Sequence, residues 1–342
     1  MTDKIDLRSL NKEELEAVFA AWGCPKYRAT QLYKWFARGI TDIEHMTDLP
    51  KSVRDRIVSE GAIASAEIQA KQQSVDGTAK YLFQFGDGER VESVFMKYKH
   101  GNTACISTQV GCRMGCAFCA STVNGLTRHL LPSEMLEQIT AIQNDSGKIS
   151  NIVLMGTGEP LDNYDNVIKF LRLVNDPEGL SIGMRHISLS TCGLADRIYD
   201  LAEENLPITL SVSLHAPNDD IRRQIMPISK RYDIDTLLKA CFDYSKKTMR
   251  RISYEYAMIR NVNDSDQCAA ELASRLKRSL CHVNLIPINR VDGTTFECSD
   301  RERIKRFVSL LESRGVTATV RRRLGSDIDA ACGQLRNRRR NT

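Results

Sequence analysis

From about residue 103 onward, short apolar runs alternate with amphipathic segments, and this alternation limits the possible folds more than any other feature of the chain. Seven runs are typical of strands, namely TACIST, ISNIVLMG, RHISLS, ITLSVSL, ISYEYAM, HVNLIPI and TATVRR. Helices are expected between them, at 133–145, 164–175, 194–204, 233–247, 265–279 and 299–314. Strands that alternate with helices build parallel sheets from βα units. Six such units are too few to close an eight-stranded barrel, so residues 96–342 are predicted to form an α/β domain with an open, partial (βα)6 barrel.

The first 95 residues follow a different pattern. Three segments have helical periodicity, namely NKEELEAVFAAW, KYRATQLYKWFARG and TDLPKSVRDRIVSEG. Two strand-like runs, AKYLFQF and VESVFMKY, then flank a glycine-containing turn, which is typical of a hairpin. Residues 1–95 are therefore predicted to form a small helical accessory domain with a β-hairpin linker.

Composition narrows the class of protein. Hydrophobic residues make up 42% of the 342 residues and charged residues 27%, as in ordinary globular proteins. No apolar run approaches the roughly 20 residues of a membrane helix, and the charged start lacks a signal-peptide core, so we expect a cytoplasmic protein with no membrane partner. Eleven cysteines, an odd number, favour metal binding or thiol chemistry over a disulfide framework.

Three of these cysteines, Cys112, Cys116 and Cys119, stand close together in GCRMGCAFC, after the first predicted strand. A structural zinc site usually takes four ligands, and no second C-x-x-C pair lies nearby. A [4Fe–4S] cluster also usually takes four thiolates, so three would leave one iron open to another ligand. Gly111 and Gly115 would let the backbone wrap closely around such a cluster.

The C-x-x-x-C-x-x-C spacing resembles the radical S-adenosylmethionine (SAM) superfamily, and MGTGEP after the second strand resembles its SAM-binding turn. This resemblance implies one [4Fe–4S] cluster held by Cys112, Cys116 and Cys119, with SAM as the exchangeable ligand of the open iron. The cluster of such enzymes delivers one electron, and SAM is cleaved to a 5′-deoxyadenosyl radical. A flavodoxin or ferredoxin system is their usual reductant.

Longer segments resemble the RlmN/Cfr family of radical SAM RNA methyltransferases. These segments are RVESVFM, ACISTQVGC, SLSTCG, SLHAPND, MPI, CHVNLIPIN and GSDIDAACGQL. The closer likeness is to the RlmN branch, which implies methylation of C2 of adenosine 2503 in 23S rRNA and, in many members, of adenosine 37 in tRNAs. The Cfr branch, which methylates C8 of the same rRNA adenosine, shares the cysteines and stays open as an alternative.

The resemblance also implies individual roles. Two SAM molecules serve each turnover: the first methylates Cys332, and the second yields the radical that activates this S-methyl group. Cys105 then resolves the RNA–protein adduct by forming a disulfide with Cys332, and Glu92 matches the proton acceptor of the family. The residues expected to bind SAM follow predicted strands; they are Gly158, Glu159, Ser190, Ser213, Leu214, His215 and Asn289.

An RNA substrate requires basic or aromatic surfaces, and two are predicted. On the segment KYRATQLYKWFAR, helical spacing places Tyr27, Gln31, Lys34 and Arg38 on one face, while Leu32, Trp35 and Phe36 can pack inward. The second surface is the basic tail around Arg321–Arg323 and Arg336–Arg340, which accounts for the net charge of +5. A monomer that grips a large RNA is the simplest expectation.

Two alternatives of other classes follow from the cysteines alone. A radical SAM activase that makes a glycyl radical on a protein would need neither the Cys105–Cys332 pair nor an RNA surface. A zinc-binding RNA module without catalysis would contain zinc rather than iron.

Overall fold

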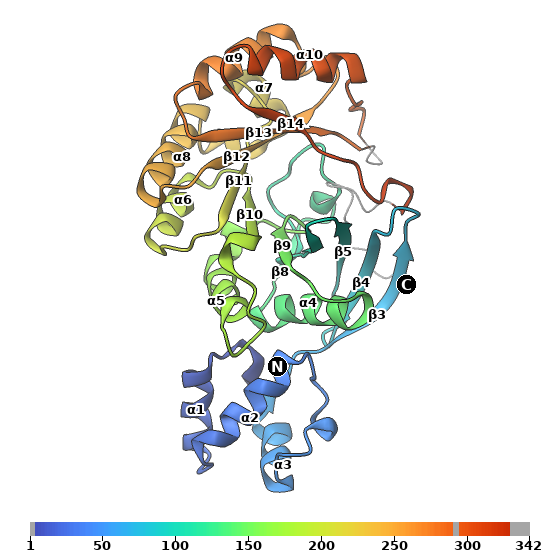
Figure 1. Ribbon diagram of the computed structural model, residues 1–342, viewed down its shortest axis with the longest axis vertical. Helices are drawn as coiled ribbons and strands as arrows, with labels where there is room; N and C mark the ends of the chain where they lie inside the picture. The colour runs from blue at the N-terminus through green and yellow to red at the C-terminus, as the bar shows by residue number, and fades with distance from the viewer. Residues whose placement is uncertain (1–3, 290–293, 329–342) are drawn as a thin grey trace.

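The computed structural model describes residues 4–289 and 294–328. Its centre is a ten-stranded sheet, ordered β14-β13-β12-β11-β10-β9-β6-β5-β4-β3 (Figure 1). Seven strands of this sheet pair in parallel. They are β6 (Gly101–Cys105), β9 (Asn151–Leu154), β10 (Ile187–Thr191), β11 (Thr209–Ser213), β12 (Ile252–Met258), β13 (Cys281–Pro287) and β14 (Ala318–Val320). All of these strands were predicted.

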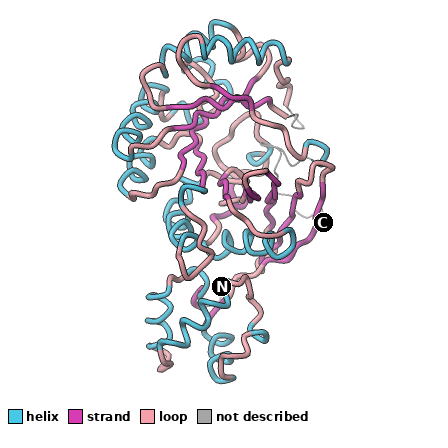
Figure 2. The backbone as a smooth tube through the Cα atoms, viewed as in Figure 1, coloured by secondary structure: helices cyan, strands magenta, loops and turns pink. Residues whose placement is uncertain are grey.

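Helices connect the parallel strands and form an outer arc around the curved sheet (Figures 1 and 2). They are α4 (Pro132–Ser146), α5 (Tyr164–Asn175), α6 (Ala195–Glu203), α7 (Asp219–Ile225), α8 (Ile234–Thr248), α9 (Asp266–Leu276) and α10 (Arg301–Glu312). The predicted α/β partial barrel is confirmed. Only α7 was not expected, because it is a seven-residue helix inside the β11–α8 connection and too short to show a helical period. Short 3₁₀ turns lie at Leu7–Ser9, Ile43–His45, Ala120–Thr122, Pro160–Asn163, Met184–His186, Pro227–Lys230 and Ser326–Ile328.

The predicted β-hairpin is part of this sheet and not a linker. Strands β4 (Ala79–Phe85) and β5 (Arg90–Tyr98) join β6 in antiparallel register, so the expected boundary at residue 95 falls inside β5. The reason is burial, because Tyr81 and Phe83 of β4 are completely buried in the main hydrophobic core. Strand β3 (Ala66–Gln73) was missed because it is an exposed edge strand of mostly polar residues.

The N-terminal helices form a unit with its own core, drawn in blue at the base of Figure 1. It contains α1 (Lys12–Ala21), α2 (Lys26–Ala37), α3 (Lys51–Glu60) and the short parallel pair β1 (Ile5–Asp6) and β2 (Gly61–Ala62). Several polar contacts attach it to the barrel, among them an ion pair and a hydrogen bond from a tyrosine. Buried Arg8 pairs with Glu137 of α4, and the Tyr33 hydroxyl donates to Asp176 at 2.8 Å. A buried charge pair with added hydrogen bonds is costly to break, so these contacts fix the unit in place.

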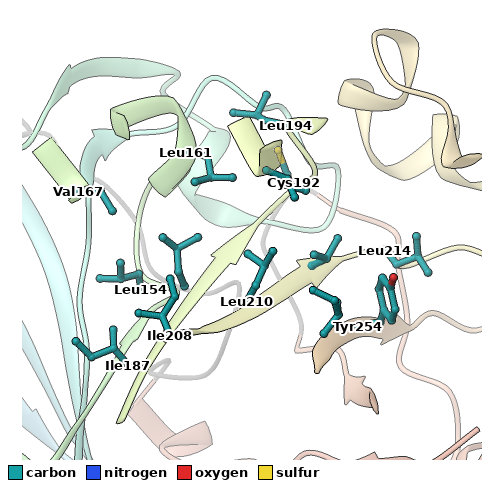
Figure 3. Close-up of a cluster of buried hydrophobic side chains, with 14 of the residues drawn as sticks. Leu154, Leu161, Val167, Ile187, Cys192, Leu194, Ile208, Leu210, Leu214 and Tyr254 are labelled. Carbon is teal, nitrogen blue, oxygen red and sulfur yellow. The ribbon is translucent and has the colours of Figure 1, made fainter. Parts of the chain in front are cut away.

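The main core fills the space between the sheet and its helices. Figure 3 shows Leu154, Ile187 and Leu210, from three neighbouring strands, with Val167 of α5 in the same cluster. Each of these four side chains is at most 1% exposed. This packing makes a rigid wall, and the loops that follow the strands are built on it. Among the described residues, no helix is long and apolar enough to cross a membrane.

Candidate functional site

A cavity opens beside the carboxyl ends of the parallel strands and encloses roughly 1030 Å³ including its mouth. Its lining contains the three cysteines of the GCRMGCAFC segment and most of the residues expected to bind SAM. These are Cys112, Cys116, Cys119, Gly158, Glu159, Ser190, Ser213, His215 and Asn289. Segments far apart in the sequence therefore meet at one place, where sites of barrel folds are built.

The cysteine loop hangs between two short antiparallel strands, β7 (Gln109–Gly111) and β8 (Leu126–His129). The Cys112 N–H donates to the Gly125 carbonyl at 2.9 Å and closes the base of the loop. Gly111 has a φ of +77°, and a Cβ there would lie 1.9 Å from the Gly125 carbonyl oxygen. Any side chain at residue 111 would therefore force the two strands apart.

The three thiols line one cavity, as expected of three ligands to one [4Fe–4S] cluster. In residues 4–289 and 294–328, no three His, Cys, Asp or Glu side chains gather closely enough to hold one metal ion. A [4Fe–4S] cluster instead binds its thiolates at different irons, so thiols spread around one cavity suit it. Burial raises the pKa of the Cys112 thiol to about 12 and that of Cys116 well above its usual value. Only a strongly bound positive centre offsets the cost of ionising such thiols.

The turn after β9 is held by the carboxylate of Glu159. One oxygen accepts from the Leu161 N–H at 3.0 Å and the other from the Cys192 N–H at 2.7 Å. Burial raises the pKa of this carboxyl. Gly158 has a φ of +110°, and a Cβ there would lie 2.6 Å from the Gln109 side chain. Both residues thus shape the wall that joins β9 to the end of β10.

His215 ends the turn after β11 with a φ of +56°. Its Nδ1 accepts from the Ala257 N–H at 2.9 Å, which assigns the ring proton of the neutral imidazole to Nε2. The ring meets Phe118 of the cysteine loop edge-on, with centroids 4.9 Å apart. Burial, with the charge of Arg222, lowers the pKa of His215 to about 3. The imidazole is therefore neutral and can offer one N–H to a bound molecule.

We expect His215 to make the protein sensitive to acid. The unfolded histidine binds a proton near pH 6.5, while the folded one does so only near pH 3, so falling pH stabilises the unfolded chain across this window. Lowering pH from 7 to 5.5 should cost about 1 kcal/mol at this site. On the same drop in pH, the free energy of unfolding of His215→Asn should fall less than that of wild type. Urea unfolding of the cluster-free protein at both pH values measures this. His45→Asn, which replaces an exposed histidine, is the control. If the stability of His215→Asn depended on pH as that of wild type does, the assignment would be contradicted.

Leu214 is the one expected SAM-binding residue whose side chain lies away from the cavity. Its side chain is completely buried and packs near Tyr254 in the main core (Figure 3). It is not part of the cavity lining, whereas its neighbours Ser213 and His215 are. The strand-end position was predicted correctly, but alternation of side chains turns this one inward.

Glu92 and Cys105 lie on adjacent antiparallel strands, outside the lining of the cavity. Val94 pairs with Cys105, so Glu92 and Cys105 are diagonal neighbours on one face, about 7–8 Å apart. The Glu92 carboxylate is buried and lies 3.5 Å from the Lys80 ammonium. Cys105 packs against Met155, which does line the cavity.

Cys332 lies outside the described residues, as do Arg336–Arg340. The described chain ends at Ile328, whose side chain packs in the same small cluster as Cys105.

Two charged residues of the cavity were missed or misplaced by sequence reasoning. Glu255 of β12 is buried in the cavity wall and accepts from the Asn284 side chain at 2.8 Å, and burial raises its pKa. Its signal in the sequence was a carboxylate inside the apolar run ISYEYAM. Arg321, assigned to the basic tail, instead lines the cavity with Nη1 3.8 Å from Glu255.

The comparisons with known proteins agree with this geometry. Residues 106–273 match the model of the radical SAM superfamily, and residues 5–63 match that of the ribosomal RNA large subunit methyltransferase N-terminal domain. A relative from Alkaliphilus metalliredigens, described as a probable dual-specificity RNA methyltransferase RlmN, is 53% identical, with 98% of this chain and 96% of that protein covered. A relative of the same description from Thermoanaerobacter sp. is 50% identical, with 97% of this chain and 98% of that protein covered.

A solved structure shows the same fold along the whole chain. The radical SAM methyltransferase from Sphaerobacter thermophilus superposes with a TM-score of 0.94 at 43% identity, covering 98% of this chain and all of that one. The radical SAM superfamily uses a [4Fe–4S] cluster and SAM, as the cysteine spacing predicted. With two relatives of at least 50% identity along nearly its full length, the chain belongs to the RlmN family of radical SAM methyltransferases.

Proposed function

We propose that this enzyme methylates C2 of adenosine 2503 in 23S rRNA and C2 of adenosine 37 in tRNAs. One observation carries the proposal. Three cysteines and the ends of β9, β10, β11 and β13 line a single cavity, in a chain about half identical to dual-specificity RNA methyltransferases. The RNA specificity rests on that likeness, and the cavity supplies the chemistry.

Adenine C2 is an electron-poor aryl carbon, so a polar transfer from SAM has no good nucleophile there. The bound cluster supplies one electron, and the reductive cleavage of SAM supplies a radical that can open another route. Cys112, Cys116 and Cys119 hold the cluster in this proposal. Polar groups at Ser190, Ser213, His215 and Asn289 then orient SAM, with the neutral His215 ring donating from Nε2.

The remaining roles belong to two thiols and one carboxylate. Cys332 carries the methyl group as a thioether, and its activated methylene bonds to C2 of the adenine. The resulting adduct is a radical, so it would also give up one electron, for which the oxidised cluster would be the acceptor. Glu92 accepts the C2 proton from this adduct. Cys105 then attacks the sulfur of Cys332, so that the S–C bond breaks, a disulfide forms and the released carbon is protonated to a methyl group. The shared face of Glu92 and Cys105 supports this division of roles.

The exposed face of α2 is proposed to contact the RNA. Tyr27 is 55% exposed, and Lys34 and Arg38 are exposed beside it, whereas Leu32 and Phe36 are buried as predicted. Trp35, expected to pack inward, is only half-buried. Its indole N–H donates to Asp48 at 2.6 Å, and Arg38 lies over its ring. This ordered cation and aromatic pair is suited to phosphates and unstacked bases.

Reversing two charges on this face should weaken RNA binding. We expect Lys34→Glu with Arg38→Glu to lower affinity for a tRNA and to reduce the slope of log affinity against log salt by about 1–2, because two phosphate contacts are lost. Filter binding across a salt series measures both. Lys246→Glu, an exposed lysine of α8, is the control. An unchanged affinity and slope would remove α2 from the RNA surface.

The cellular setting is proposed on the same basis. Ribosomal RNA and tRNA are met in the cytoplasm, so we place the enzyme there and propose that it acts as a monomer. A flavodoxin or ferredoxin system would deliver the electron to the cluster. The accessory helices α1 to α3, with the hairpin that follows, are proposed to position the RNA over the catalytic barrel.

The test is an anaerobic assay with the reconstituted cluster, SAM, a reductant and unmodified RNA. A 23S rRNA fragment and a tRNA serve as separate substrates, and digested nucleosides are identified by mass spectrometry. 2-Methyladenosine from both RNAs is the expected result. 8-Methyladenosine would assign the enzyme to the C8-methylating branch. No methylated nucleoside, with SAM still cleaved, would overturn the substrate assignment.

A further inference from the structure

Arg222 lies in the middle of α7, and its side chain is completely buried. Its guanidinium group reaches the ends of two parallel strands. Nη2 donates to the carbonyl oxygen of Cys192 at 2.7 Å and is 3.3 Å from that of Ser213, while Nε donates to that of Leu214 at 3.2 Å. The side chain therefore connects the ends of β10 and β11, which form part of the wall of the SAM cavity.

The guanidinium group of Arg222 has no ion-pair partner among the described residues. Its Nη1 is buried and has no hydrogen-bond partner there, and no carboxylate within residues 4–289 and 294–328 forms an ion pair with it. The groups that act on it are three thiols, Cys192, Cys116 and Cys241, and the carboxylate of Asp219. Burying an unpaired charge costs several kcal/mol, so such an arrangement is expected where a bound anion completes the site.

The segment after Arg222 touches the cysteine loop directly. The Ala117 N–H donates to the Ile225 carbonyl at 2.9 Å, and Pro227 lies 3.3 Å from the position of a Cβ on Gly115. Cys116 thus lies between Ala117, which is hydrogen-bonded to the end of α7, and Gly115, which lies beside Pro227 just after α7. The guanidinium group is therefore close to the place where the cluster is bound.

The cluster is the anion that this site would receive. A [4Fe–4S] core with three thiolates carries a net charge of about −1 when oxidised and about −2 when reduced. A fixed positive charge nearby stabilises the more negative state more strongly. Arginine keeps its charge throughout the physiological pH range, although burial lowers its pKa here.

We propose that Arg222 is the counter-charge of the iron–sulfur cluster and raises its reduction potential, so that the electron needed for SAM cleavage enters more easily. The proposal rests on the cluster but not on the identity of the RNA. Arg222 is a positioning residue, because its charge acts on the cluster and not on the substrate. Its three contacts with backbone carbonyl oxygens hold the guanidinium group in place.

The test is a redox titration of the holoenzyme, followed by the electron paramagnetic resonance signal of the reduced cluster, without RNA. Arg222→Gln should lower the reduced-to-oxidised ratio at a fixed potential by about tenfold, or about 59 mV for one electron. Arg222→Lys keeps the charge and should stay near the wild-type potential. Arg223→Gln, on the same helix but half-exposed beside Asp220, is the matched control and should have no effect.

Two outcomes would overturn the proposal. The first is Arg222→Gln with the wild-type potential and a full cluster. The second is a reduction potential in Arg222→Lys as low as that expected for Arg222→Gln. The lysine keeps the charge and loses only the hydrogen bonds to the strand ends, so the potential would then depend on those bonds and not on the charge. If Arg222→Gln does not hold a cluster, the lysine variant decides alone. Neither readout involves methyl transfer, so a failure of the substrate assignment would appear separately in the nucleoside assay.

Discussion

Cys116→Ala is expected to abolish cluster binding, and with it all SAM cleavage and methyl transfer. Cys116 lies between the other two cysteines of the loop and lines the cavity with them. Two remaining thiolates would leave a second iron without a protein ligand, and we expect such a cluster to be lost during purification. Iron per chain should fall from about four atoms to nearly none after anaerobic reconstitution.

The control for this variant is Cys241→Ala. Cys241 is a completely buried thiol in α8 that packs in the main core, so its replacement removes a sulfur without touching the cavity. It should keep its iron and its charge-transfer absorbance. Full iron content in Cys116→Ala would show that another residue supplies the third ligand.

Cys105→Ala is expected to trap the enzyme on its RNA. Without the resolving thiol, the bond between the Cys332 sulfur and the methylene carbon attached to adenine C2 has no route to break, so a covalent adduct should accumulate. Methylated product should fall by about 10²–10⁴-fold. A denaturing gel with labelled RNA detects the adduct, and nucleoside analysis measures the product.

Cys268→Ala is the matched control, because Cys268 is a buried thiol of α9 far along the chain from the proposed chemistry. It should show full turnover and no adduct. Adding Cys332→Ala to Cys105→Ala should remove the adduct, since the linking sulfur is then gone. Normal turnover in Cys105→Ala would contradict the role given to this thiol.

The repeating part of the fold could be predicted because its signal is local. Helix α5 spans 164–175, as expected, and strand β12 coincides with the run ISYEYAM. Hydrophobic periodicity and chain order set both elements. Elements without such a signal were missed. Strand β3 presents polar side chains to solvent at a sheet edge, and α7 is too short to establish a period.

The residues of the candidate site were taken from the resemblance to the RlmN/Cfr family, and the fold explains why they lie together. Parallel strands end at the same edge, so Gly158, Ser190, Ser213 and Asn289 had to gather once the sheet was known. Side-chain direction was harder to predict. Leu214 turns into the core and Arg321 turns into the cavity, and each orientation depends on packing against strands distant in sequence.

The central claim is that the methyl group passes through a cysteine and a radical. It can be tested with SAM whose methyl group carries three deuterium atoms, followed by mass spectrometry of both products. If the S-methyl group of Cys332 loses one hydrogen to the deoxyadenosyl radical, 2-methyladenosine should keep two deuterium atoms and 5′-deoxyadenosine should gain one. A product methyl group with all three deuterium atoms, and none in 5′-deoxyadenosine, would show direct transfer and contradict the account.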